Sequence, residues 1–192
     1  MNEADASYFE SLTLPHRNAL YQAARSMTNN SAAAEDAVQE AYLQGWKSFH
    51  RFEPGTNCRA WMFAILFNVI RHERRKWIFR IHFPETAEVF ERTLRYEPPV
   101  PEELDDEETL AAIREIPQKY AEVLMMADVQ ELAYKDIHRA LDIPMGTVMS
   151  RLSRGRQLLR VKLAGRAAEL GFKSAGFSAA VPQPKRSRAA VL

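Results

Sequence analysis

The chain has 192 residues, 46% of them hydrophobic, which allows one domain or two small ones around a packed core. No apolar run approaches the ~20 residues of a membrane-spanning helix, and the acidic start MNEADASYFE lacks the layout of a signal peptide. A single cysteine, Cys58, excludes an intrachain disulfide and a multi-cysteine zinc site, so we expect a protein of the reducing cytoplasm without membrane insertion.

The formal net charge is only +1, but the charge is segregated along the chain. Residues 71–80 and 149–166 are strongly basic, whereas residues 85–108 are dominated by Glu and Asp. Binding to nucleic acid needs local positive charge, because the free energy comes from counterions released at the contacted phosphates. The near-neutral total therefore does not exclude a DNA-binding protein.

The first predicted helix begins near Pro15 and runs to about Thr28, and Ser31 is the expected N-cap of the next. The second helix, AAAEDAVQEAYLQGWKSFHRF, has apolar residues at the helical period. Its expected core residues are Val38, Ala41, Tyr42, Gly45, Trp46, Phe49 and Phe52. The opposite side carries an acidic–amide patch of Glu35, Asp36, Gln39 and Glu40. By its charge pattern alone, such a patch is typical of solvated surface.

A loop follows at Glu53-Pro54-Gly55-Thr56-Asn57, indicated by Pro-Gly and the polar residues beside it. The next predicted helix, RAWMFAILFNVIRHERRKW, begins apolar and ends cationic, and Asn68 lies where the character changes. The aromatic residues of this stretch are Trp61, Phe63, Phe67 and Trp77, and the basic residues at its end are Arg71, His72, Arg74, Arg75 and Lys76. Most of these aromatics are expected in the core, but aromatics beside a basic rim also suit stacking on unpaired bases.

From Phe83 to about Asp106 the regular pattern lapses, and prolines and acidic residues predict a linker, with a helical turn around 85–95. A helix carrying Leu110, Ile113 and Ile116 then ends at Pro117. Another begins in QKYAEVLMMADVQ with Tyr120, Val123, Leu124 and Ala127 turned inward. No strand pairs are predicted, so the expected class is all-α.

The stretch ELAYKDIHRALDIPMGTVMSRLSRGRQLLRVKL predicts a helix-turn-helix. Its short helix has inner positions Leu132, Ala133, Ile137 and Leu141. After a break at Asp142-Ile143-Pro144, a longer helix buries Val148, Leu152, Gly155, Leu159 and Leu163. Off that stripe the helix carries two hydroxyl residues, six cations and no acid: Thr147, Ser150, Arg151, Arg154, Arg156, Arg160, Lys162 and Arg166. A second helix of this kind enters a DNA groove, although a cationic helix face alone is more often solvated.

Together these stretches resemble the extracytoplasmic-function (ECF) sigma factors, the small promoter-recognition subunits of bacterial RNA polymerase. EDAVQEAYLQGWKSFHRF resembles the family's region 2.1–2.2, RAWMFAILFNVIRHERRKW its region 2.3–2.4, and MGTVMSRLSRGRQLLR its region 4.2. The resemblance implies a region 2 helical bundle at 1–82, an acidic linker at 83–106, a region 4 helix-turn-helix at 107–165 and a flexible basic tail at 166–192. It implies no enzyme activity and no cofactor.

The resemblance also implies roles for individual residues. Asp36, Gln39 and Glu40 match the face that docks on the clamp coiled coil of the polymerase's largest subunit, and region 4 would meet the flap. Residues implied at the −10 element are Phe52, Glu53, Pro54, Gly55, Thr56, Asn57, Trp61, Asn68, Arg71, Arg74 and Arg75. Those implied at the −35 element are Thr147, Ser150, Arg151 and Arg154, with Arg156 and Arg160 on phosphates. An anti-sigma factor is a further implied partner.

Three positions depart from the family pattern. Met149 stands where Lys or Arg is common and Ser153 where a larger side chain is frequent, so the −35 preference need not be the usual one. His138 occupies a position generally held by Ala, and we expect a structural histidine there.

Two other classes of protein compete with this interpretation. A free-standing helix-turn-helix regulator with an N-terminal sensing or dimerising domain explains residues 131–163 equally well, but gives no purpose to the acidic–amide patch. A helical-bundle enzyme or metal protein would use the five histidines at 16, 50, 72, 82 and 138, but none of them has a metal-ligand spacing such as HExxH.

Overall fold

The computed structural model describes residues 3–78 and 106–169, with side chains described for residues 3–73 and 107–167. Within these two ranges every regular element is helical and no strand occurs, which confirms the all-α class. None of the helices in the described ranges combines the length and the apolar composition that crossing a bilayer requires.

The N-terminal half contains α1 (Glu3–Thr13), α2 (Arg17–Thr28), α3 (Ser31–Ser48) and α4 (Cys58–Ile78), with short 3-10 turns at Leu14–His16 and Phe49–Arg51. Helix α1 was not predicted from the sequence. It contacts α4, and its buried Phe9 packs edge-to-face on Phe49 with ring centroids 5.1 Å apart.

The N-cap of α3 is Asn30, not Ser31 as predicted. Asn29 adopts a left-handed conformation (φ 54°) that ends α2, and Asn30 is extended, with its side-chain oxygen accepting the N–H of Ala33 at 3.0 Å. The cap thus falls one residue earlier, because Asn satisfies a free N–H as well as Ser does.

Helix α4 forms the centre of this half and contacts α1, α2 and α3. Its Met62, Phe63, Leu66 and Phe67 are fully enclosed. Of the core residues predicted on α3 and just after it, Val38, Ala41, Gly45 and Phe52 are buried, whereas Tyr42, Trp46 and Phe49 are half-buried.

The C-terminal half contains α6 (Asp106–Glu115), α7 (Gln118–Leu124), a π-helical turn (Met125–Val129), α8 (Tyr134–Leu141) and α9 (Met145–Glu169). The sequence predicted the break at Pro117 but not the π-helical turn. Helix α9 lies against α6, α7 and α8. A Cβ at Gly155 would come within 3.1 Å of the Leu124 side chain, so glycine lets α9 approach α7 this closely.

Two predictions for this half are wrong in detail. Ala133, expected inside, is exposed because it is the extended N-cap residue that precedes α8. Helix α9 continues past Gly165, the expected end of the domain, to Glu169, since Arg166 pairs with Glu108 and Glu115 and Ala167 is buried. The predicted turn at 85–95, nearly all of the predicted linker and the rest of the tail lie outside the described residues.

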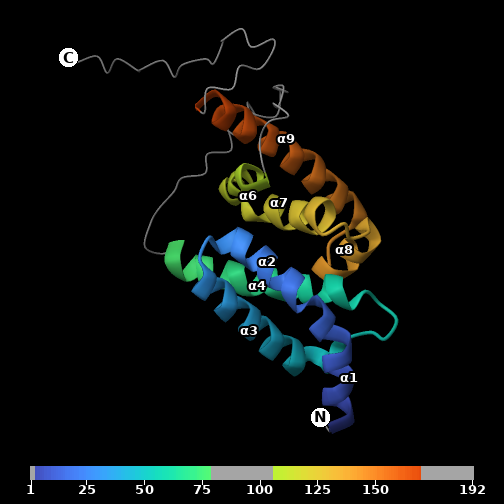
Figure 1. Ribbon diagram of the computed structural model, residues 1–192. Helices are drawn as coiled ribbons and strands as arrows, with labels where there is room; N and C mark the ends of the chain where they lie inside the picture. The colour runs from blue at the N-terminus through green and yellow to red at the C-terminus, as the bar shows by residue number, and fades with distance from the viewer. Residues whose placement is uncertain (1–2, 79–105, 170–192) are drawn as a thin grey trace, which may run out of the picture.

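The two halves pack on each other. In Figure 1 the helices α6 to α9, yellow to red, lie over α2 and α4, and direct contacts join α4 to α8 and α2 to α6. Buried residues of both halves belong to one hydrophobic cluster. The sequence predicted two separate helical domains joined by a linker, and their packing on each other was not predicted. Asn68 and Arg154 nevertheless remain exposed.

Candidate nucleic-acid and partner surfaces

The helix-turn-helix is held by a tight turn between α8 and α9. Asp142 takes a left-handed conformation (φ 50°) that closes α8. The carbonyl of Pro144 accepts the N–H groups of Thr147 and Val148 at 2.8 and 3.1 Å, which starts α9. Nδ1–H of His138 donates to the carbonyl of Ile143 at 2.6 Å. The histidine thus fixes the turn, as expected for a structural residue.

The outer face of α9 is lined by small exposed residues, Gly146, Ser150 and Ser153. Beside them Arg154 is exposed and forms no ion pair with the described residues. Met149 is 56% exposed. Small side chains let a helix backbone approach base edges closely, while an unpaired guanidinium reaches a guanine in the major groove.

Several cations of α9 are paired by acids from other elements. Arg156 donates from Nε and Nη2 to the two oxygens of Asp128 at 3.0 and 2.7 Å, and from Nη2 to the Tyr134 hydroxyl at 3.3 Å. These bonds raise the pKa of Arg156 above its ordinary value. Nζ of Lys162 lies 3.1 Å from Oε2 of Glu115. The sequence shows no acid on α9 before Glu169 at its end, so only the fold reveals this pairing. A phosphate contact by Arg156 would use a side chain already oriented by Asp128.

The acidic–amide patch lies on α3 with Glu35, Asp36, Gln39 and Glu40 all exposed. Nε2 of Gln44 donates to Oε1 of Glu40 at 3.0 Å, an exposed pair one helical turn apart. The patch borders a groove of about 820 Å³, whose lining includes Glu35 and Gln39 as well as Leu14, Tyr21 and Tyr42. This surface combines negative charge, an amide and an apolar hollow.

The loop at residues 53–57 is anchored at both ends. Before it, Phe52 is buried with its ring stacked on Phe49, centroids 5.8 Å apart. Within it, the hydroxyl of Thr56 donates to the Glu53 carbonyl at 2.7 Å, and Gly55 has φ +86°. After it, Oδ1 of Asn57 accepts the N–H of Ala60 at 3.1 Å and so caps α4. Exposed Glu53, Pro54 and Gly55 are thus presented on a rigid support.

On α4, Asn68 is exposed and Trp61 is half-buried. Arg71, expected to face DNA, is half-buried and forms a bidentate pair with Glu122 of α7. Arg74 and Arg75 belong to α4, but their side chains lie outside the described residues. The structure therefore brings the loop and Asn68 into one half and places Arg71 at the contact between halves.

Sequence reasoning missed Glu122 and Arg59. Glu122 is fully buried, and Arg59 donates to Oε1 of Gln130. A lone acid in the apolar run YAEVLMM was the available signal for Glu122, because an acid is rarely buried without a partner. Nothing near Arg59 in the sequence points to Gln130, 71 residues away.

Burial raises the pKa of the Glu122 carboxyl above its ordinary value of 4.5, while the guanidinium of Arg71 opposes this shift. A raised folded-state pKa favours folding when the acid is protonated, and this contribution is lost as the pH rises through that value. We therefore expect the folded protein to lose stability relative to Glu122→Gln as the pH is raised from below 4.5 to neutral. Urea unfolding of both proteins across this pH range measures the difference in their free energies of unfolding. A difference that does not change with pH would contradict a raised pKa for Glu122.

Comparisons with known proteins match the same stretches. The family model "Sigma-70 region 2" matches residues 12–77 and "Sigma-70, region 4" matches residues 106–159. The ECF RNA polymerase sigma factor EcfG of Rhodopseudomonas palustris (strain TIE-1) is 32% identical over 138 residues, covering 72% of this chain and 75% of the relative. SigW of Bacillus subtilis (strain 168), also an ECF RNA polymerase sigma factor, is 24% identical, covering 85% and 92%.

Two solved structures are similar. The sigma factor RpoE in complex with the anti-sigma factor NepR, from Bartonella quintana, aligns with a TM-score of 0.61 and 25% identity over 81% of this chain and 96% of that one. CnrH in complex with the cytosolic domain of CnrY aligns with a TM-score of 0.55 and 22% identity over 86% and 89%, a likeness of fold. Similarity thus extends over both halves of the chain.

Proposed function

The chain belongs to the ECF sigma factors of bacterial RNA polymerase, which direct promoter-specific transcription initiation, and we propose that α9 holds the −35 element while α4 and the loop at 53–57 hold the −10 element. The observation that carries the proposal is the exposed outer face of α9, where Arg154 lies among small residues and forms no ion pair within the described ranges. No catalytic residue is needed, because polymerase performs the chemistry.

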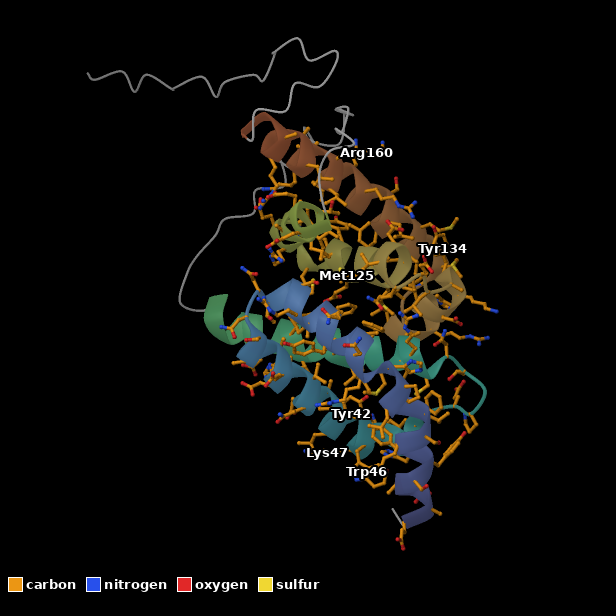
Figure 2. All side chains as sticks on the ribbon, in the orientation of Figure 1. Tyr42, Trp46, Lys47, Met125, Tyr134 and Arg160 are labelled. Carbon is orange, nitrogen blue, oxygen red and sulfur yellow. The ribbon has the colours of Figure 1, made fainter. Side chains whose placement is uncertain are left out.

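At the −35 element, Thr147, Ser150, Arg151 and Arg154 would meet base edges and Arg156 and Arg160 the phosphates. A guanidinium reads guanine through two parallel hydrogen bonds, whereas phosphate contacts fix register without reading sequence. Arg160 lies on the α9 side of the molecule, well away from Tyr42 and Trp46 (Figure 2).

Arg154→Ala should weaken binding to the −35 element by about 1–3 kcal/mol and relax the base preference at one position. Binding to a set of single-base −35 variants, together with run-off transcription from the matched promoter, measures both effects. Arg139→Ala, an exposed arginine on α8, is the matched control. Unchanged transcription with Arg154→Ala would show that another residue reads this position.

At the −10 element, the exposed tip of the loop would hold a flipped base and Asn68 would contact a second one. Unstacking a base costs a few kcal/mol per step, and its capture in a protein pocket offsets that cost. Trp61 and the basic end of α4 would then hold the separated non-template strand by stacking and charge.

Polymerase core would bind through Asp36, Gln39 and Glu40, with the clamp coiled coil lying along the patch and its neighbouring groove, and the flap meeting the C-terminal half. We further propose that the chain works in the cytoplasm beside polymerase and is held inactive there by an anti-sigma factor. Selection of promoter DNA by reconstituted holoenzyme tests the function as a whole: it should enrich two elements at a fixed spacing, and enrichment of a single palindrome would favour a free-standing regulator.

A further inference from the structure

Met149 is the most exposed large apolar residue in the described ranges, with 56% of its surface accessible. It lies in the second turn of α9, the helix proposed to bind the −35 element. Met145, at the first position of the same helix, is 37% exposed. Residues four apart in a helix lie on one face, so two thioether side chains form an apolar edge at the start of α9.

A single exposed apolar side chain is ordinary on a protein surface, but Met149 has an unusual position. An α-helix turns about 100° per residue, so Met149 and Arg154, five residues apart, point about 140° away from each other around the helix axis. The arc between them is filled by the small exposed residues Gly146, Ser150 and Ser153. The outer face of α9 therefore has a cationic edge at Arg154 and an apolar edge at Met149.

A hollow of about 330 Å³ adjoins Met149 on the side of Arg156 and Arg160. Tyr134 also lines it, and Figure 2 shows Tyr134 and Arg160 on the α9 side of the molecule. Asp128 holds Arg156 in place there, and both arginines are proposed to contact phosphates. Met149 thus lies between the residues proposed for phosphates and those proposed for base edges. The space beside it lets an unbranched, adaptable side chain follow the group it meets.

Thymine presents the apolar group that such a side chain would meet. Its C5-methyl is the one methyl group that base pairs expose in the major groove, and the N-terminal residues of a recognition helix are those that reach base edges. The hydroxyl of Ser150 donates to the carbonyl of Thr147 at 3.1 Å, so Ser150 offers a base only its acceptor lone pairs. Neither this serine nor Arg154 can distinguish thymine by its methyl group.

We propose that Met149 contacts the C5-methyl of a thymine in the −35 element and is a specificity-determining residue of this site. The inference rests on the proposed function and adds a preference for thymine to the guanine contact of Arg154. Burial of the methyl against the thioether removes apolar surface of both groups from water. Uracil pairs with adenine as thymine does and lacks only this methyl, so replacing thymine by uracil abolishes the contact.

Competition between the thymine and uracil forms of one promoter for limiting holoenzyme measures the contact. The promoter is the one that reconstituted holoenzyme selects, and each thymine on either strand of its −35 element is replaced in turn. At one position the uracil form should bind roughly fourfold more weakly, the effect of removing one buried methyl group. With Met149→Ala the two forms should bind equally. Comparing both proteins on both promoters cancels any effect of uracil on the shape of the DNA.

Two further variants separate an apolar contact from other effects. Met149→Gln keeps the length of the side chain without its apolar end, so it should lose the preference as Met149→Ala does. Val129→Ala shortens an apolar side chain that is 43% exposed outside α9, and it should keep the preference. Met149 is exposed and alanine favours a helix, so Met149→Ala should melt as the unaltered chain does, which circular dichroism checks.

The proposal is overturned if the selected −35 element contains no thymine, or if no thymine-to-uracil change weakens binding. It is also overturned if the preference persists in Met149→Ala or Met149→Gln. Equal weakening of every promoter form by Met149→Ala, together with poorer capture by polymerase core, would assign Met149 to a protein partner instead. In each of these cases the proposed function stands, because holoenzyme still selects a −35 element. A holoenzyme that selects none removes the proposed function, and this inference with it.

Discussion

Replacing Gln39 with Ala and Glu40 with Lys should weaken capture of the chain by polymerase core by about a hundredfold or more and leave the helical fold intact. Both residues are exposed on α3, and the only described hydrogen bond lost is the exposed Gln44–Glu40 pair. A like charge placed in a complementary interface costs several kcal/mol, whereas on a free surface it costs little. Pull-down with purified core, beside a circular-dichroism melt, measures the two quantities.

The matched control is Gln22→Ala/Glu10→Lys, which makes the same changes on α2 and α1, at positions that are also exposed. It should bind core as the unaltered chain does. Equal loss of binding in both proteins would show that overall charge, rather than the patch on α3, governs the interaction. Retained binding by Gln39→Ala/Glu40→Lys would remove this patch as the docking surface.

Phe67→Ala should lower the free energy of unfolding by about 3–5 kcal/mol, the range for deleting an enclosed aromatic ring. Phe67 is 0% exposed in α4, the helix that contacts α1, α2 and α3 in its own half and α8 in the other. In a chain of this length the melting temperature should fall by roughly 10 °C. Urea unfolding monitored by circular dichroism gives the value.

Phe67→Leu provides the comparison, because it keeps most of the side-chain volume and should cost less than about 1.5 kcal/mol. Two separate transitions in the unfolding curve of the unaltered chain would contradict a common core. The hydrophobic cluster that joins both halves instead predicts one transition.

Periodicity was enough to predict most of the helices. The apolar spacing in α3, α4 and α9 led to the correct buried faces, and therefore to the exposure of Gln39, Asn68 and Arg154. Helix α1 was not predicted because its short sequence EADASYFESLT has few apolar positions. One of them, Phe9, becomes buried only by packing on residues from α3 and from the turn after it.

The contacts between the halves could not be predicted in the same way. Asn57 and Asp136 are 79 residues apart, and Arg71 and Glu122 are 51 apart, so no local pattern links them. The sequence marks which residues are polar and where helices begin. Which donor meets which acceptor depends on how the two halves are oriented. For the same reason the sequence of α9 could not predict that Arg156 pairs with Asp128, which lies outside that helix.

The π-helical turn at Met125–Val129 has a geometric consequence for the path of the chain after α7. An α-helix advances about 100° in rotation per residue, and a π-turn fits an additional residue into the helical path. The helical path ends at Val129 and α8 begins only at Tyr134, so the additional residue sets the direction in which the chain leaves α7, not the rotation of α8 or α9. One extra residue at the end of a helix can in this way change where the following helix begins.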